Sequence, residues 1–225
     1  MDVLSAILYR QCIRAFIDKP VLKSEVDKIL NTAKWAPSGV NSQPWRVIAL
    51  TGPAKKALCD AVIEKFDARV PANPDYHYYP GEWVEPYKSR RKACGLALYS
   101  ALNIQKGDEE KRRVAWRRNY EFFGAAVGLL FFVEKRVETG SWMDMGIFLQ
   151  SVMLAARGLG LETCPQASMA EYPDVVRDVL KVGAEWAVVC GMALGHADWD
   201  QPVNQYRTTR EPESAFAELR GFEHG

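Results

Sequence analysis

The chain has 225 residues, which suits one good-sized domain or two small ones and allows a core that needs no disulfides or structural metal. A hydrophobic content of 48%, a charged content of 25% and a formal net charge of +1 are ordinary globular values. The small net charge excludes the strong positive potential that would favour binding to nucleic acid or to an anionic membrane. The longest nearly apolar run, residues 122–133, is too short to cross a bilayer as a helix, and the N-terminus lacks a signal peptide's basic region.

The first half of the chain is predicted to hold a helix, a strand, a second helix and a long loop. Ser24-x-x-Asp27 resembles a capping box, and the helix that follows should end near Trp35, because Pro37 disfavours helical geometry in the residue before it. Residues 45–52 predict a strand, and residues 53 to about 68 a helix. The segment 71–87, with four prolines and four tyrosines, favours an extended aromatic loop.

The second half is expected to be helical from about 88 to 119, with a break near Gly107-Asp108. Two apolar runs, 125–134 and 185–197, predict strands buried on both faces. Between them, Ser141-x-x-Asp144 is a second capping-box candidate for a helix that should end at Gly160. The last thirty residues are polar and arm-like. Helices and about three strands without strict alternation favour an α+β fold over a doubly wound sheet.

The sequence contains few residues in recognisable catalytic motifs. Five widely scattered cysteines without a Cys-x-x-Cys pair indicate free thiols in a reducing compartment, so a cytoplasmic location is expected. They are Cys12, Cys59, Cys94, Cys164 and Cys190. The three histidines, His77, His196 and His224, belong to no metal or nucleophile motif, and no nucleotide-binding loop occurs. If the protein is an enzyme, its chemistry is expected to come from a cofactor other than a metal.

Two pairs of arginines are candidates for binding an anion. Arg10 and Arg14 lie four residues apart, so both guanidiniums can converge on one phosphate from a helix end or the turn after it. On spacing alone, a solvated surface pair explains them equally. Arg207 and Arg210 near the C-terminus either complete the same site or only decorate the tail.

Two polar loops are candidates for contacting a ligand. The loop APSGVNSQPW, residues 36–45, carries several hydrogen-bonding side chains on a backbone that two prolines stiffen. The segment GLGLETCPQASMAEYP, residues 158–173, brings small residues that let a ligand approach backbone N–H groups closely. Each loop is also explained by a structural role alone.

The basic run Lys111-Arg112-Arg113 with Arg117-Arg118 suggests a nucleic-acid surface at first sight. Acidic residues surround it, however, so a solvated helix face is the expected interpretation.

Taken together and in this order, these segments resemble the FMN-dependent nitroreductase family. The match begins with Arg10-Gln11-Cys12-Ile13-Arg14-Ala15-Phe16 and continues through AKWAPSGVNSQPWRVIAL, GAAVGLLFFVE, DMGIFLQSVMLAARGLGLETCP and the C-terminal TREP. The resemblance covers essentially the whole chain. The aromatic insert and the segment PYKSRRKACGLALYSAL are most similar to the branch that acts on nitroaromatics such as nitrobenzoates.

The resemblance implies a single α+β domain, residues 1–225. The expected fold is a sandwich with a central, mostly antiparallel sheet flanked by helices, in an intertwined homodimer that exchanges C-terminal arms, about 198–225. Two FMN sites would lie at the subunit interface, with residues 37–43 lent by the partner subunit. The expected cofactor-binding residues are Arg10, Gln11, Cys12, Arg14, Pro37, Ser38, Gly39, Asn41, Gln43, Pro165, Gln166, Ala167, Ser168, Arg207 and Arg210. The family usually has serine at the position of Cys12 and a basic residue at that of Gln11, so these contacts should be weaker.

The implied activity is ping-pong reduction of nitroaromatics. NAD(P)H, either NADH or NADPH, would give hydride to flavin N5, and the nitro compound would then be reduced to nitroso and hydroxylamino stages. No catalytic side chain is expected, because backbone amides near Ala167 and Ser168 and nearby arginines would stabilise the reduced flavin. A mobile lid within residues 70–120 and beyond would include Tyr76, Tyr78, Tyr79, Trp83, Tyr87, Phe122 and Phe123.

Several alternatives stay open from sequence. The same scaffold could carry out reductive dehalogenation, ene reduction or flavin-consuming synthesis. The chain could also be a non-catalytic flavin-binding module. The aromatic segment could serve surface or dimer packing in place of a lid.

Overall fold

Four antiparallel strands form one central sheet in the order β1-β2-β4-β3. The computed structural model describes residues 1–222, so His224 lies outside the described part. The strands are β1 (Arg46–Leu50), β2 (Val127–Glu134), β3 (Glu162–Gln166) and β4 (Trp186–Gly195). The α-helices are α1 (Val3–Tyr9), α2 (Lys23–Ala33), α3 (Gly52–Asp67), α4 (Tyr87–Ala101), α5 (Glu109–Arg117), α6 (Thr139–Gly158), α7 (Pro173–Leu180) and α8 (Pro202–Gln205). Four short 3₁₀ segments are η1 (Gly39–Asn41), η2 (Arg118–Gly124), η3 (Ala167–Ala170) and η4 (Glu213–Ala215).

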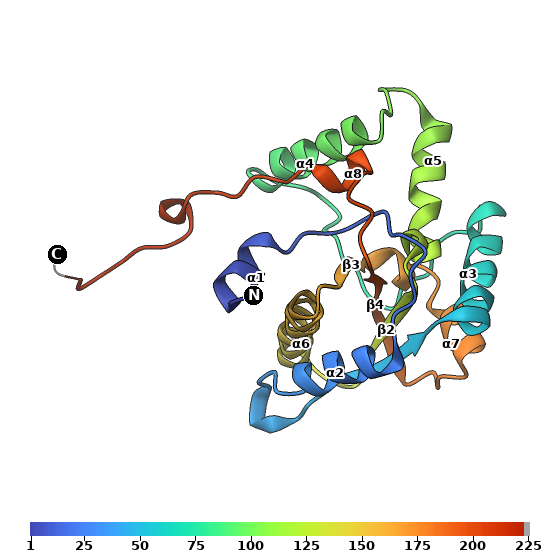
Figure 1. Ribbon diagram of the computed structural model, residues 1–225, viewed down its shortest axis with the longest axis horizontal. Helices are drawn as coiled ribbons and strands as arrows, with labels where there is room; N and C mark the ends of the chain where they lie inside the picture. The colour runs from blue at the N-terminus through green and yellow to red at the C-terminus, as the bar shows by residue number, and fades with distance from the viewer. Residues whose placement is uncertain (223–225) are drawn as a thin grey trace.

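The sheet is covered by helices on both faces, as the period-two pattern of strand side chains requires. In β2, Leu129 and Phe131 are fully buried in the cluster formed with α2 and α6. Leu130 and Phe132 are equally buried in the opposite cluster, formed with α3 and α7. Figure 1 shows α2 and α6 on one side of the strands and α3 and α7 on the other. The α+β sandwich with an antiparallel sheet is therefore confirmed.

A β-bulge in β4 prepares one wall of the site. Phe131 is paired with Cys190 and Phe132 with Val188, so Val189 is the extra residue of the bulge. The carbonyl oxygen of Val189 instead accepts a hydrogen bond from the hydroxyl of Tyr76 at 2.5 Å. The bulge thereby attaches the aromatic segment 71–87 to the sheet.

The first expected capping box is wrong. Ser24 lies inside the first turn of α2, and the side chain of Glu25 caps the helix by accepting the backbone N–H of Leu22 at 2.8 Å. In a capping box, the carboxylate three residues after the N-cap accepts the N–H of the N-cap residue. The N-cap is therefore Leu22, two residues before the expected Ser24.

The second capping box is also wrong, because α6 begins before Ser141. The carboxylate of Asp144 instead accepts the backbone N–H of Gly39 at 3.2 Å. This contact connects the loop of residues 36–45 to α6.

The strand β3 was not expected as a strand. It contains Pro165, which lacks an N–H, and it lies at the edge of the sheet, where a proline is tolerated. The other strands, the break between α4 and α5, and the glycine at the end of α6 (Gly160, φ +73°) agree with expectation.

Close approach at Gly128 fixes the position of η2. Phe122 has a φ of 52° and its fully buried ring lies against β2 and β4. A Cβ at Gly128 would meet this ring at 2.7 Å, and one at Gly191 would meet Met169 at 2.5 Å. Both strands therefore need glycine where the η2 and η3 side chains cross the sheet.

Gly128→Ala is expected to destabilise the protein by about 1–3 kcal/mol, because a methyl group overpacks the Phe122 ring. Gly95→Ala in α4 is the matched control, since a Cβ there would meet no heavy atom within 4 Å. That control is expected to gain about 0.5 kcal/mol from lower unfolded-state entropy. Urea denaturation of both variants measures the difference, and equal midpoints would contradict the packing argument.

Candidate active site

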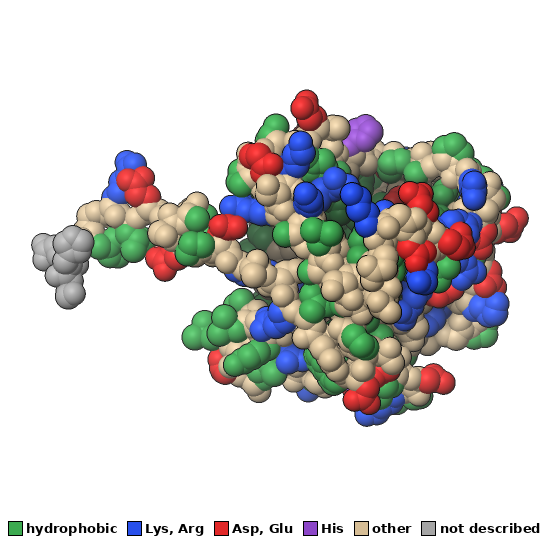
Figure 2. All heavy atoms as spheres, turned by 90° about the horizontal axis from the view of Figure 1, so that it is seen from above, with side chains coloured by type: hydrophobic (Ala, Val, Ile, Leu, Met, Phe, Trp, Pro, Cys, Tyr) green, Lys and Arg blue, Asp and Glu red, His purple; other side chains and the backbone are tan. Residues whose placement is uncertain are grey.

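A cavity of about 510 Å³ opens where the edge strand β3 meets the aromatic segment and the helices α4 and α5. Space filling shows one face of the body hollowed, with basic side chains gathered beside the hollow (Figure 2). The residues that line it and that were expected in the site are Arg14, Tyr76, Tyr78, Tyr79, Phe123, Pro165, Gln166, Ala167 and Ser168. Further lining residues are Ala72, Pro74, His77, Leu98, Tyr99, Leu102, Arg112, Ala115, Trp116, Arg118, Asn119, Ala170, Glu171 and Val203.

The N-terminal segment reaches the cavity because it pairs with β3. Ile13 donates its backbone N–H to the carbonyl of Thr163 at 3.1 Å. The side chain of Asn204, only 1% exposed, accepts the backbone N–H of Arg14 at 2.8 Å and donates to the carbonyls of Ala15 and Asp198. Arg14 is therefore held by its backbone and keeps its guanidinium for the cavity.

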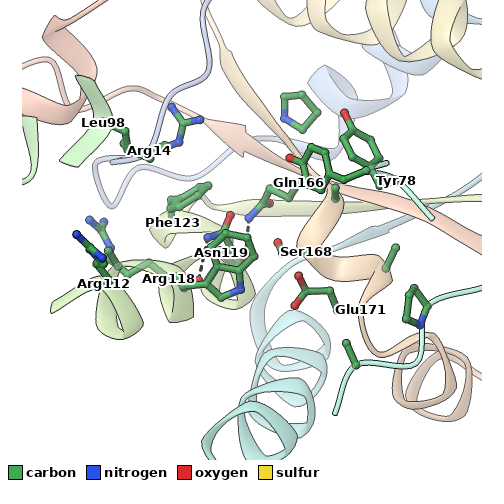
Figure 3. Close-up of a pocket in the computed structure, with 18 of the residues that line it drawn as sticks. Arg14, Tyr78, Leu98, Arg112, Arg118, Asn119, Phe123, Gln166, Ser168 and Glu171 are labelled. Carbon is green, nitrogen blue, oxygen red and sulfur yellow. Dashed lines mark hydrogen bonds between the residues drawn. The ribbon is translucent and has the colours of Figure 1, made fainter. Parts of the chain in front are cut away.

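The β3–η3 connection presents polar atoms that lack partners. The amide Nε2 of Gln166 donates to the carbonyl of Asn119 at 2.5 Å, which leaves its Oε1 directed elsewhere (Figure 3). Oε1 of Gln166 and Oγ of Ser168 are both buried without a hydrogen-bond partner, and so is Oε1 of Gln11 nearby in the N-terminal segment. Buried polar atoms are normally paired, so these atoms indicate a ligand that supplies their hydrogen bonds.

Aromatic rings form a continuous row beside the cavity, and Tyr76, Tyr78 and Tyr79 of this row line it. The ring of Tyr76 packs against Trp142 with centroids 4.6 Å apart, and Tyr78 and Tyr79 follow at 6.4 and 4.7 Å in edge contacts. Trp83 continues the row from Tyr79 at 5.7 Å. Burial raises the pKa of Tyr76 and of Tyr78, so both hydroxyls stay neutral donors at physiological pH.

Asp75 anchors this row. Its carboxylate, 9% exposed, bonds Arg177 at 2.5 Å and Lys135 at 2.9 Å and accepts the backbone N–H of Val188 at 3.2 Å. Burial alone would raise the pKa of Asp75, but the hydrogen bonds from Arg177 and Lys135 outweigh it and lower the pKa. The negative charge of Asp75 is therefore part of the folded structure.

Two thiols lie close together near Arg14, which lines the cavity, and Arg10. Cys12 forms a parallel bridge with Thr163, next to Cys164; the neighbouring Cys164 thiol lowers the pKa of Cys12, and Arg14 and Arg10 lower it further. The same contact, with burial, raises the pKa of Cys164. Cys12 therefore lies in the positive field of Arg14 and Arg10.

Other expected site residues lie apart from the cavity. The loop residues Pro37, Ser38, Gly39, Asn41 and Gln43 do not line it. Ser38 Oγ accepts the backbone N–H of Gln43 at 3.0 Å, and the Gln43 side chain donates to the Asn41 carbonyl. These contacts stiffen the loop, and its expected contribution to a partner's site stays a prediction.

The C-terminal arginines are also outside the cavity of their own chain. Arg207 donates to the carbonyl of Leu8, and Arg210 bonds only Thr208 and Thr209 of its own segment. Arg10 does not line the cavity either, and its guanidinium lies 3.9 Å from the sulfur of Met153. Their expected role in binding a phosphate stays a prediction.

The expected lid needs one correction. Phe122 is fully buried in the core between the sheet and α3, so it cannot belong to a mobile lid. Its neighbour Phe123 lines the cavity, because the positive φ of both residues turns the chain between them. Tyr87 is 56% exposed and begins α4 outside the cavity.

Several site residues were missed from sequence. Arg112 and Arg118 line the cavity, so the interpretation of this run as a wholly solvated helix face is wrong. Glu171 also lines it; burial raises the pKa of its carboxyl group, which accepts a hydrogen bond from the Tyr120 hydroxyl. Asn204 had no sequence signal, since a single asparagine in a polar tail predicts no contact.

The comparison with known proteins agrees with this geometry. The family model described as "Nitroreductase family" matches residues 7–196. The chain belongs to the nitroreductase family. A 4-nitrobenzoate reductase of Pseudomonas putida is 36% identical over 222 residues, which cover 99% of this chain and 97% of the relative. A nitrobenzene nitroreductase of Ectopseudomonas oleovorans is 40% identical over 87% of each chain. The crystal structure of the FMN and NADPH-dependent nitroreductase NfnB of Sphigopyxis sp. strain HMH has a TM-score of 0.95 and 36% identity, over 99% of this chain and all of that one.

Residues 1–222 of this nitroreductase contain neither a metal-binding cluster nor a membrane span. No group of three or more histidine, cysteine or acidic residues there could hold a metal ion. Likewise, no described helix is both long and apolar enough to cross a membrane.

Asp75→Asn is expected to lower the free energy of unfolding by about 3 kcal/mol at pH 7, because it leaves the largely buried Arg177 and the partly exposed Lys135 without their counter-charge. The loss should be constant above the unfolded pKa of about 4 and should shrink as pH falls through the lower folded pKa of Asp75. Urea denaturation from pH 7 to pH 3 measures both effects. Asp178→Asn, which removes a surface pair with Lys181, is the control and should change stability by less than about 0.5 kcal/mol. A loss in the Asp75 variant that persisted undiminished at pH 3 would contradict the assignment.

Proposed function

We propose that this nitroreductase is an FMN-dependent NAD(P)H oxidoreductase that reduces nitroaromatic compounds. The observation that carries the proposal is the pair of unpartnered buried atoms, Gln166 Oε1 and Ser168 Oγ, on the wall of an aromatic cavity beside Arg14. A flat heteroaromatic ring with hydrogen-bonding edges fits such a wall. The names of the relatives, which reduce nitrobenzoate or nitrobenzene or depend on FMN and NADPH, support the same interpretation.

The residues present fit FMN. When bound, FMN supplies hydride transfer between a nicotinamide and an oxidising substrate. Gln166 and Ser168 would satisfy polar atoms at the flavin edge, with Gln166 held in place by Asn119. Tyr76, Tyr78 and Tyr79 would cover the cavity and keep water from the reacting atoms.

A phosphate group would be held by arginines at the N-terminal side. The Nη1 atom of Arg14 lies 3.5 Å from both the Cys12 carbonyl and the Tyr206 hydroxyl, contacts too long to occupy it fully. Within residues 1–222, no acidic group forms an ion pair with Arg10, Arg14 or Arg210. These guanidiniums are therefore available to an anion.

We further propose a homodimer that completes the site with residues 37–43 and the C-terminal arm. Apolar side chains of α1 and of the arm are exposed in the single chain: Val3, Leu4, Leu8, Phe216, Leu219 and Phe222 are each 65–75% exposed. Between Glu211, which pairs with Arg90, and Phe222, the arm runs away from the body (Figure 1). Exposed apolar side chains concentrated on these two segments are typical of a protein interface. The five free cysteines support a reducing, cytoplasmic environment.

The function is tested by anaerobic spectroscopy. NADH or NADPH should bleach the flavin absorbance of the FMN-loaded protein, and nitrobenzene or 4-nitrobenzoate should restore it. Bound flavin that neither nicotinamide bleaches would instead favour the flavin-binding module. Reoxidation by halogenated phenols or activated alkenes, but not by nitro compounds, would favour a dehalogenase or an ene-reductase.

The phosphate assignment is tested by Arg10→Ala combined with Arg210→Ala. Two lost charge-assisted contacts should weaken FMN binding about 10²- to 10⁴-fold. Riboflavin, which lacks the phosphate, should bind both proteins with similar affinity. Fluorescence titration with each flavin measures the ratio, and sedimentation checks that the dimer persists.

Arg220→Ala is the control on the same arm, because Arg220 pairs only with the exposed Glu218. It should leave FMN affinity within about twofold of wild type. Equal weakening of FMN and riboflavin in the double variant would refute the phosphate assignment.

A further inference from the structure

The arginines of the α5–η2 segment fall into two pairs, one facing Asp67 and one facing the cavity. Arg113 and Arg117 leave the cavity side and share the carboxylate of Asp67, at 2.8 and 3.2 Å. Arg112 and Arg118 line the cavity instead. In Figure 3 both side chains extend toward the same end of the cavity, away from Gln166 and Ser168.

Arg112 and Arg118 form no ion pair within the described part of the chain. Within residues 1–222, no carboxylate forms an ion pair with either guanidinium, although ion pairs occupy both of their neighbours. The Nε atom of Arg112 is buried without a hydrogen-bond partner, and its guanidinium lies 5.2 Å from the ring centre of Tyr99. Both side chains are partly buried at the cavity wall, and guanidinium groups without an ion-pair partner there are available to an anion that arrives with a ligand.

The rest of the cavity defines what that ligand is. Its walls between the arginines and Gln166 are largely apolar or aromatic, with Leu98, Trp116 and Phe123 among them. The acidic side chain in the lining, Glu171, is held by the Tyr120 hydroxyl, and burial favours its uncharged form. A flat apolar body with one carboxylate therefore matches the cavity, because planar guanidinium groups bind carboxylates by paired hydrogen bonds.

We propose that Arg112 and Arg118 form a carboxylate subsite that makes nitroaromatic acids, such as nitrobenzoates, the preferred substrates. This inference rests on the proposed function. Similarity to known proteins does not decide it, because relatives of comparable identity are named for an acidic and for a neutral nitrobenzene. The absence of ion pairs at Arg112 and Arg118 favours the acidic nitrobenzoate over the neutral nitrobenzene.

The test compares 4-nitrobenzoate with nitrobenzene in the FMN-loaded protein. Arg112→Gln and Arg118→Gln should each lower the ratio of kcat/KM for the acid over that for nitrobenzene by about 10- to 100-fold, through KM of the acid. Arg113→Gln is the matched control, one residue away and facing Asp67, and should keep the wild-type ratio. An unchanged ratio in both cavity variants would overturn the proposal.

A second readout separates this proposal from the proposed function. Benzoate, which has no nitro group, should bind the FMN-loaded protein in calorimetric titration and should bind both glutamine variants about 10- to 100-fold more weakly. If that pattern holds while no nitro compound is reduced, the subsite stands and the proposed reaction fails.

The 2′-phosphate of NADPH is another anion that Arg112 and Arg118 could bind. If Arg112→Gln weakens NADPH but not NADH in flavin reduction, and leaves benzoate binding unchanged, the subsite belongs to the reductant and the proposal is overturned.

Discussion

The site depends on one buried asparagine that ties the two ends of the chain together. Asn204, just before the C-terminal arm, uses its side chain to bond the backbone of Arg14, Ala15 and Asp198, and its carbonyl accepts from Gln11. These bonds hold the N-terminal segment along β3, where Arg14 enters the cavity and Cys12 meets Cys164. Because the bonds are to backbone atoms, the arginine side chain stays available for a ligand. The binding chemistry of the N-terminus thus rests on a residue 190 positions away.

Much of the fold follows from local sequence, and the exceptions have identifiable causes. The buried runs of β2 and β4 were predictable because both faces of a central strand are apolar. The strand β3 was not, since five residues that include Pro165 carry no alternation, and only pairing with β4 makes them a strand. The capping boxes failed because Ser-x-x-Asp also occurs inside a helix; Glu25 accepts the N–H of Leu22 at the start of α2, whereas Asp144 accepts the N–H of Gly39 in the loop 36–45.

The candidate site was predictable only in part. Arg14 and the segment 165–168 were candidates from their residue types, and only the family resemblance assigned them to one site, since neither is distinctive alone. Arg112 and Arg118 were missed because their run looks uniformly basic along the sequence. The difference between them and Arg113 and Arg117 comes from Asp67, which lies about fifty residues earlier and neutralises only the outward pair. Tertiary neighbours, not local pattern, decide which of four arginines can serve a ligand.

The exposed arm beyond Asn204 makes the stability of part of the molecule depend on protein concentration. Phe216, Leu219 and Phe222 meet solvent in a single chain, so ordering them gains no burial until another chain covers them. In the proposed homodimer that gain enters by mass action, whereas the sheet core folds within one chain. Dilution would then loosen the arms, and with them any site completed by the partner, while the sheet stays intact. Cofactor retention would thus follow protein concentration.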